Sequence, residues 1–149
     1  MTQKYNIAVA GATGAVGAEI VQILEQRDFP IENLFLLASS KSKGKKVEFR
    51  DEEIVVEDLS EFDFSKAHIG LFSPGGKISA EYAPKAAKAG CIVIDNTSHF
   101  RMKQNIPLLV PEVNAHVLDE FFDDENRTNI ISNPNCSTIQ MVVALKPLH

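Results

Sequence analysis

Three glycines spaced three residues apart, Gly11, Gly14 and Gly17, connect an apolar run at residues 7–10 to a helical pattern at residues 15–26. The first glycine permits a tight turn, the second lets the backbone approach a pyrophosphate, and the third lets the helix lie against the strand. The free N–H groups at the start of the helix then bind the anion. This order of strand, loop and helix favours a dinucleotide site over a glycine turn selected only for packing, although the spacing is a variant of the usual fingerprint. The residues expected to contact the cofactor here are Gly11, Thr13, Gly14, Ala15 and Val16.

Short apolar runs alternate with helical patterns along the rest of the chain. Runs that suit strands covered on both faces lie at residues 7–10, 34–37, 69–72, 92–94 and 129–131. Residues 46–58 alternate enough to predict a short antiparallel ribbon beside the main sheet, and residues 123–127 predict an acidic, solvated turn. The alternation predicts one α/β domain over residues 1–149, with a Rossmann-like, doubly wound, mostly parallel sheet and helices on both faces.

Three helices are expected between these strands. The first covers residues 15–26 and the second residues 78–89, with Gly90 ending it. The third covers residues 114–121, after Pro111. The side chains expected to face the sheet are Val16, Ile20, Ile23 and Leu24 in the first helix, and Ile78, Tyr82, Ala86 and Ala89 in the second.

Composition excludes several classes of protein. The formal net charge is −5, whereas a nucleic-acid partner requires a basic face. No apolar run approaches the ~20 residues of a membrane span, so no membrane partner is expected. Cys91 and Cys136 are the only cysteines, too few for a zinc site or a disulfide framework, so we expect no metal and a location in the reducing cytoplasm.

The segment after the second predicted strand indicates which dinucleotide binds. An acidic residue there would bind the ribose 2′-hydroxyl of NAD, whereas hydroxyl and cationic groups would take the 2′-phosphate of NADP. Residues 38–46 contain serines and lysines, and the first carboxylate is Glu48. The alternative is an exposed, lysine-rich turn with no ligand, but its place in the fold favours NADP. The residues expected to contact the cofactor are Ser39, Ser40, Lys41 and Ser42.

Cys136 follows the last predicted strand and precedes a helical pattern containing Ile139, Val142, Val143 and Leu145. Open α/β sheets bind ligands at this edge, and a helix N-terminus stabilises a thiolate. Free cysteines are more often buried as small hydrophobic residues, which is the expectation for Cys91. The asparagines and hydroxyls around Cys136 instead predict a nucleophile.

Two further loops leave the ends of predicted strands. The first contains Ser73, Gly75 and Gly76, whose backbone is expected to lie against the cofactor. The second, residues 95–101 (DNTSHFR), contains Asn96 and Arg101 where a substrate would lie, and a guanidinium can bind a phosphate with two parallel N–H groups. A surface arginine paired with a nearby acid is the alternative for Arg101. We expect His99 and His116 to be structural.

These motifs resemble those of the aspartate-semialdehyde dehydrogenase family, and the resemblance runs across essentially the whole chain. It rests on residues 11–17, 39–44, 95–101, 110–114 (VPEVN) and 133–140 (NPNCSTIQ). Two positions depart from the common pattern. Lys41 stands where bacterial members usually have arginine, and Pro74 replaces the usual alanine, which removes one N–H near the cofactor.

The resemblance implies a reaction in which L-aspartyl 4-phosphate and NADPH give L-aspartate 4-semialdehyde, phosphate and NADP⁺, on the route to lysine, threonine and methionine. Cys136 would attack the acyl phosphate to give a thioester, which accepts hydride while remaining tethered. Asn135 would orient the acyl group and Arg101 would hold the phosphate. The full-length enzyme is expected to be a homodimer or a dimer of dimers.

In the family, the general-base histidine, a substrate-binding arginine, an active-site glutamine and the dimer-forming domain lie further along the chain. We therefore expect this chain to be the N-terminal portion of a longer enzyme, able to bind cofactor but not to turn over. His149 is not expected to be the missing base.

Two rival interpretations differ at particular residues. N-acetyl-glutamyl-phosphate reductase shares the fold and the thioester mechanism, but it typically has glycine before its cysteine, where this chain has Asn135. The other alternative is a non-catalytic NADP-binding regulatory domain, which the placement of Cys136 disfavours for the whole protein.

Overall fold

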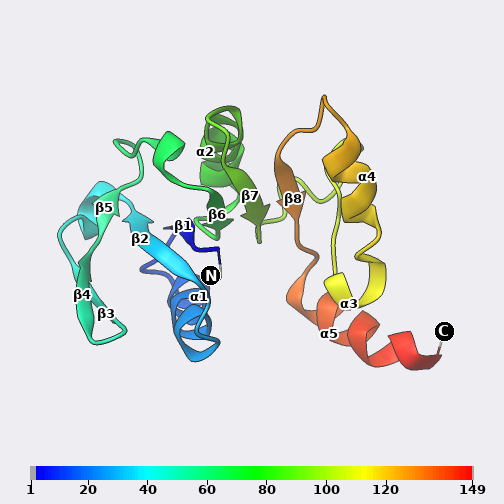
Figure 1. Cartoon of the computed structure of the whole chain (residues 1–149), viewed down its shortest axis with the longest axis horizontal. Helices are drawn as coiled ribbons and strands as arrows, with labels where there is room; N and C mark the ends of the chain where they lie inside the picture. Colours follow the sequence, from blue (N-terminus) through cyan, green and yellow to red (C-terminus); the bar gives the residue numbers. More distant parts are fainter. Residues whose placement is uncertain (1–2, 149) are drawn as a thin grey trace.

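The computed structural model describes residues 3–148 and contains a six-stranded sheet in the order β5-β2-β1-β6-β7-β8, with every neighbouring pair parallel (Figure 1). The strands are β1 (Tyr5–Ala10), β2 (Ile31–Ala38), β5 (Glu57–Asp58), β6 (Ile69–Phe72), β7 (Ile92–Asp95) and β8 (Ile130–Ser132). The expectation for His149 lies outside the described residues. The doubly wound α/β fold and all five predicted strands are confirmed.

The antiparallel ribbon is also present. It consists of β3 (Lys46–Phe49) and β4 (Glu52–Val55), which pair only with each other in a separate two-stranded sheet within the described residues. The chain then adds β5 to the edge of the main sheet beside β2, where Asp58 lies opposite Ala38. The predicted ribbon over residues 46–58 therefore ends in a parallel edge strand.

The strands alternate their side chains between two apolar layers. In β1, Ala8 and Ala10 belong to the core cluster on the side of α2, whereas Ile7 and Val9 belong to the cluster on the side of α1. Burial on both faces explains why these strands are nearly continuous apolar runs. The chain winds outward in both directions from β1 and β6, so the carboxyl ends of these two strands form the point where the strand order reverses, and ligands bind there in open α/β sheets.

Helix α1 (Ala15–Gln26) has the predicted bounds, but the predicted buried face is wrong in part. Its buried residues are Gly17, Val21 and Leu24, whereas Val16 and Ile23 are 52% and 39% exposed. A Cβ atom at Gly17 would overlap the carbonyl oxygen of Gly11. This close contact between helix and loop sets the rotation of α1 and turns Val16 outward.

Helix α2 (Gly76–Lys88) begins two residues earlier than predicted, and of its residues predicted to face the sheet, Ala86 is buried as expected but the others are not. The buried side is formed by small residues: Ser79, Ala83, Ala86 and Ala87. Ile78 is 39% exposed and Tyr82 is half-buried. Small side chains let the helix approach the sheet closely, which moves the larger residues to its edge. Gly90 has φ of 93°, as expected for the turn that ends a helix.

The helix predicted at residues 114–121 is two short helices, α3 (Pro111–Asn114) and α4 (Val117–Asp123). Pro111 starts α3, and the Asn114 side chain accepts a hydrogen bond from the Val110 N–H at 2.8 Å, which closes the turn locally. Short 3₁₀ segments complete the chain: η1 (Ser40–Ser42), η2 (Phe64–Lys66) and η3 (Lys146–Leu148).

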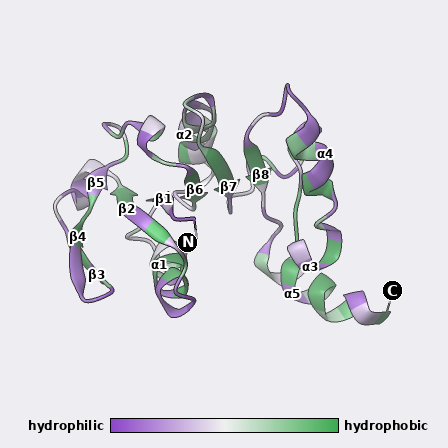
Figure 2. Ribbon diagram, viewed as in Figure 1, coloured by the Kyte–Doolittle hydropathy of each residue, from purple (hydrophilic) through white to green (hydrophobic). Residues whose placement is uncertain are grey.

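Helix α5 (Cys136–Leu145) follows β8, as predicted, and projects from the body of the domain (Figure 1). It is rich in apolar residues (Figure 2), yet no residue of α5 is buried. Met141 and Leu145 are 56% and 51% exposed. Among the described residues, no helix is both long enough and apolar enough to cross a membrane.

Candidate functional site

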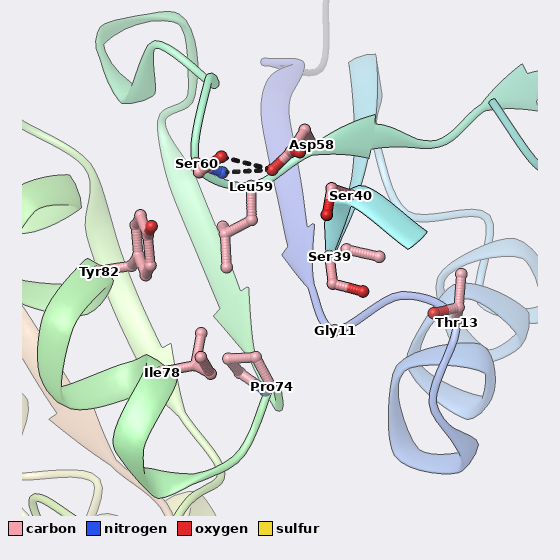
Figure 3. Close-up of a pocket in the computed structure, with 11 residues that line it drawn as sticks. Gly11, Thr13, Ser39, Ser40, Asp58, Leu59, Ser60, Pro74, Ile78 and Tyr82 are labelled. Carbon is pink, nitrogen blue, oxygen red and sulfur yellow. Dashed lines mark hydrogen bonds between the residues drawn. The ribbon is translucent and has the colours of Figure 1, made fainter. Parts of the chain in front are cut away.

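A cavity of about 320 Å³ opens at the carboxyl edge of the sheet, between the glycine loop, the segment after β2, the end of β5 and the start of α2 (Figure 3). It brings together predicted cofactor residues from two separate loops. Its lining consists of Gly11, Thr13, Ala38, Ser39, Ser40, Asp58, Leu59, Ser60, Pro74, Ile78 and Tyr82.

The glycine loop meets the loop after β6 at the floor of this cavity. Gly11 has φ of 85°, and a Cβ atom there would lie 2.8 Å from the Ser73 carbonyl. The backbone N–H of Ser73 donates to the Ala10 carbonyl at 2.9 Å. Gly14 caps α1 without a side-chain hydrogen bond, so backbone N–H groups alone face outward from the helix start. The loop therefore has the open, side-chain-free surface that a pyrophosphate requires.

The segment after β2 lies beside the glycine loop. Thr13 donates from its hydroxyl to Ser42 Oγ at 3.4 Å, which joins the two loops. Two of the predicted cationic groups are paired elsewhere, because Lys43 contacts Glu61 and Lys46 contacts Glu53 at 2.6 Å. Lys41 and Lys45 form no ion pair with any residue between 3 and 148. Of the four lysines at residues 41–46, these two therefore remain, with the serine hydroxyls, as candidate groups for a dianion.

The sequence reasoning missed Asp58, a carboxylate in the same cavity. Asp58 is only 8% exposed, and its Oδ1 accepts hydrogen bonds from the backbone N–H of Ser60 at 2.9 Å and from its hydroxyl at 2.7 Å. These bonds from Ser60 lower the pKa of Asp58 below its ordinary value, so it is ionised at neutral pH. Asp58 belongs to β5, and a strand of two residues is too short to be recognised from its sequence pattern.

Helix α2 links the cofactor loop to the loop that follows β7. Its cap residue Gly75 has φ of 95°, and Gly76 lies beside Ser98 and His99 of the second loop. Asp95 is fully buried at the end of β7, where it accepts hydrogen bonds from Ser79 of α2 at 2.6 Å and from Thr97 at 2.7 Å. The buried carboxylate therefore fixes the loop of residues 95–101 against α2.

Arg101 is half-buried and is not a surface arginine paired with an acid. Its Nε donates to the carbonyl of Asn133 at 2.9 Å, and one terminal nitrogen, Nη2, donates to the carbonyl of Asn96 at 2.9 Å. The side chain of Asn133 donates in turn to Asn96 Oδ1 at 2.7 Å. These three residues join the loop after β7 to the loop that leads to Cys136. Two of the predicted substrate residues, Arg101 and Asn96, are thus brought together.

Cys136 is exposed at the first residue of α5, and Asn135 caps this helix. Asn135 Oδ1 accepts hydrogen bonds from the N–H of Ser137 at 3.0 Å and from its hydroxyl at 2.6 Å, and it lies 3.8 Å from the Cys136 sulfur. Cys91 is fully buried, as predicted, and burial raises the pKa of its thiol to about 12. The two cysteines therefore differ strongly in access to solvent.

The two histidines considered earlier lie on exposed loops. His99 packs edge-on against Phe100, with ring centroids 4.7 Å apart, and His116 directly precedes α4 without a side-chain capping hydrogen bond. That both histidines are structural stays a prediction.

Comparison with known proteins extends these observations. The chain is 56% identical over all of its 149 residues to aspartate-semialdehyde dehydrogenase 2 of Vibrio cholerae, and it covers 43% of that protein. The crystal structure of aspartate semialdehyde dehydrogenase II complexed with ASA, from the same organism, matches with a TM-score of 0.92 at 55% identity, over 98% of this chain and 46% of that one. Aspartate semialdehyde dehydrogenase with NADP from Candida albicans matches with a TM-score of 0.80 at 27% identity, over 98% of this chain and 47% of that one.

The chain thus spans less than half the length of these relatives. Residues 6–121 match the family described as "Semialdehyde dehydrogenase, NAD binding domain". The parallel sheet and the glycine loop are the structural features of such a domain. On this evidence the chain belongs to the semialdehyde dehydrogenase family and comprises its nucleotide-binding domain.

Proposed function

We propose that this chain is the cofactor-binding and nucleophile-bearing portion of an NADP-dependent aspartate-semialdehyde dehydrogenase. One observation carries the proposal: the glycine loop follows β1 and Cys136 follows β8, in a sheet whose paired strands all run in the same direction. Both features therefore lie at the same edge of the sheet. The names of the relatives favour this enzyme over N-acetyl-glutamyl-phosphate reductase.

The residues of the cavity fit a dinucleotide. Gly11 and Thr13 line the cavity, and Gly14, Ala15 and Val16, which follow them at the start of α1, would complete the backbone surface for a pyrophosphate. From the loop after β6, Pro74 lines the cavity, and the neighbouring Ser73, Gly75 and Gly76 would contact the cofactor. When bound, NADPH supplies the hydride for the reduction.

The preference for NADP rests on the segment after β2. Hydroxyl groups of Ser39, Ser40 and Ser42, together with the Lys41 ammonium, would bind the 2′-phosphate. Lysine in place of the usual arginine keeps the charge but loses the planar pair of donors.

The chain's own residues account for the first half of the reaction. The Cys136 sulfur attacks the acyl carbon of L-aspartyl 4-phosphate, the bond from that carbon to the phosphate oxygen breaks, and phosphate leaves with the electron pair. The resulting thioester stays tethered to Cys136 as the group that a bound NADPH would reduce, and release of the aldehyde would then restore the thiolate. Nδ2 of Asn135 is available to hold the acyl oxygen because Oδ1 caps the helix.

Arg101 is placed to hold the phosphate. Its Nε and Nη2 contact backbone carbonyls, while Nη1 donates to no group within residues 3–148. A guanidinium fixed in this way presents its remaining N–H groups without a large loss of side-chain freedom. Asn96 lies beside it and would complete the polar surface.

The remaining elements of the enzyme are proposed to lie outside this chain. They include the general base and the domain that forms a homodimer or dimer of dimers. The chain alone should then bind cofactor but should not catalyse phosphate-dependent oxidation of the aldehyde. Turnover by the purified chain would refute the proposal that the general base lies outside it. A cytoplasmic location is part of the proposal, supported by two free thiols.

Calorimetry with NADP⁺ and NAD⁺ tests the cofactor. The chain should bind NADP⁺ more tightly, and Lys41→Ala should weaken NADP⁺ binding about tenfold while leaving NAD⁺ binding unchanged. Lys46→Ala is the matched control, because Lys46 is already paired with Glu53. Equal or tighter binding of NAD⁺ by the wild-type chain would overturn the NADP assignment.

A further inference from the structure

The end of the cavity farthest from the glycine loop contains a charged group that the cofactor argument has not used. Asp58 is more than nine-tenths buried, at the last residue of β5. Both hydrogen bonds from Ser60 end on Oδ1. Oδ2 accepts no hydrogen bond from the described residues. The carboxylate is therefore held in one orientation with one acceptor atom uncommitted.

The residues of the cavity lie in a definite order (Figure 3). Gly11 and Thr13 lie at one end, then Ser39 and Ser40, and Asp58 with Ser60 lies at the other end. A dinucleotide whose pyrophosphate contacts the glycine loop and whose ribose lies beside Ser39 places its purine beyond them, toward Asp58.

The wall between the two ends suits a flat apolar ring. It is formed by Leu59, Pro74, Ile78 and Tyr82, whose side chains line the cavity from two sides (Figure 3). Ile78 and Tyr82 belong to α2, where small buried residues leave them at the edge of the helix facing this space. A purine between them would have its six-position edge at the polar end.

We infer that Oδ2 of Asp58 accepts a hydrogen bond from the exocyclic amine of the adenine ring and thereby selects adenine over purines with a carbonyl at that position. The inference rests on the proposed function, since it assumes a dinucleotide in this cavity. A carboxylate oxygen that faces position 6 attracts an amine donor and repels a carbonyl oxygen, so it favours adenine over a purine with a carbonyl there. The ionised state of Asp58, which the Ser60 hydrogen bonds favour by lowering its pKa, fits this role.

Ribose recognition is the competing role for this carboxylate. A carboxylate that binds the ribose 2′-hydroxyl belongs at the end of β2. Asp58 lies on the neighbouring strand, and Ser39 and Ser40 lie between it and the glycine loop (Figure 3). The order of residues therefore assigns the serines to the ribose and Asp58 to the base.

Calorimetry with two nucleotides tests the inference on the whole chain. The probes are NADP⁺ and nicotinamide hypoxanthine dinucleotide phosphate, in which a carbonyl and an N1–H replace the 6-amine and the N1 acceptor of adenine. The wild-type chain should prefer NADP⁺ by roughly tenfold or more, the usual effect of a hydrogen bond to a charged group. Equal affinities would overturn the inference without any variant.

Asp58→Asn sharpens the test. Asparagine keeps an oxygen to accept from Ser60 and replaces Oδ2 by a donor, so the turn can persist while the base preference changes. The ratio of the two affinities should fall at least tenfold, through weaker NADP⁺ binding and stronger binding of the hypoxanthine nucleotide. An unchanged ratio in this variant would mean that Asp58 only closes the turn, which overturns the inference.

Asp63→Asn is the matched control. The Asp63 carboxylate accepts the same pair of hydrogen bonds, from the N–H and the hydroxyl of Ser65, but Asp63 does not line the cavity, so the adenine preference should remain. A shift in NADP⁺ against NAD⁺ binding in Asp58→Asn, with the purine ratio unchanged, would assign Asp58 to the ribose and overturn the inference. Failure of the wild-type chain to bind either NADP⁺ or NAD⁺ would instead remove the proposed function itself.

Discussion

The Arg101 guanidinium donates from Nε to the backbone carbonyl of Asn133 at 2.9 Å, and this bond joins the loop after β7 to the loop that leads to the exposed thiol. A second bond reaches the carbonyl of Asn96, so one side chain ties both loops. The residue proposed to hold phosphate is therefore also a structural tie between the two parts of the site.

Replacing Arg101 by lysine tests the structural role of its side chain. Lysine keeps the charge but cannot span two carbonyls with a planar group, so we expect the free energy of unfolding to fall by about 1–2 kcal/mol. Urea denaturation measures the change. Arg127→Lys is the control, because Arg127 makes similar bonds to Asn129 and Phe122 in an exposed place, and it should change stability less. Equal losses of unfolding free energy in the two variants would contradict a structural role for Arg101 in joining the two loops.

Two glycines of the same loop should respond differently to alanine. A Cβ atom at Gly17 would overlap the Gly11 carbonyl, so Gly17→Ala should destabilise the domain by about 1–3 kcal/mol. At Gly14, φ is −83° and the nearest atom to a Cβ lies 3.4 Å away, so Gly14→Ala should fold normally. It should nevertheless lose most of its NADP⁺ affinity, because the methyl group would occupy the approach to the pyrophosphate. Thermal unfolding and calorimetry together check this, and a destabilised Gly14→Ala would be the unexpected result.

The two thiols should differ in alkylation. Cys136 is exposed at a helix start, whereas Cys91 is fully buried with a pKa of about 12. Iodoacetamide at neutral pH should therefore modify Cys136 at least a hundredfold faster, and Cys91 should react only after unfolding. Mass spectrometry of the folded chain follows both sites in one sample. Comparable rates would exclude an activated thiolate at Cys136.

Stability should also depend on pH through Cys91. Its thiol ionises near an ordinary value of 9.0 when unfolded and near 12 when folded. Between these values the folded state binds one more proton than the unfolded state, so the free energy of unfolding falls as pH rises from about 9 toward 12. The contribution is at most about 1.4 kcal/mol per pH unit. Denaturation of wild-type and Cys91→Ala chains across this range isolates it, because only the wild type has this slope; parallel curves would show that burial does not hold the proton.

Much of the sheet could be predicted from the sequence, because strands buried on both faces consist of continuous apolar runs. The bounds of α1 could also be predicted, because its helical pattern is uninterrupted. Its rotation was not predicted, because the contact between Gly17 and Gly11 outweighs the burial of Val16. The break between α3 and α4 likewise depends on one side-chain bond from Asn114.

The site was predicted where it depends on local order and missed where it depends on strand pairing. The loops containing Gly11, Ser39 and Cys136 each follow a recognisable strand. Asp58 enters the cavity only because a two-residue strand pairs with β2, and such a strand has no periodicity to detect. The hydrogen-bond partners of Arg101 are backbone carbonyls, and every residue type has one, so the sequence does not indicate which residues they belong to.

The cysteine proposed as nucleophile begins a helix of ten residues that buries none of its side chains. A helix of that length is barely stable in water by itself, and this one packs on the domain only through half-buried residues, Ile139, Val142 and Val143. The N–H groups of its first turn therefore lie beside the sulfur only while the helix is folded. A surface that covered Met141 and Leu145 would stabilise the helix and so hold these groups in place without touching the sulfur.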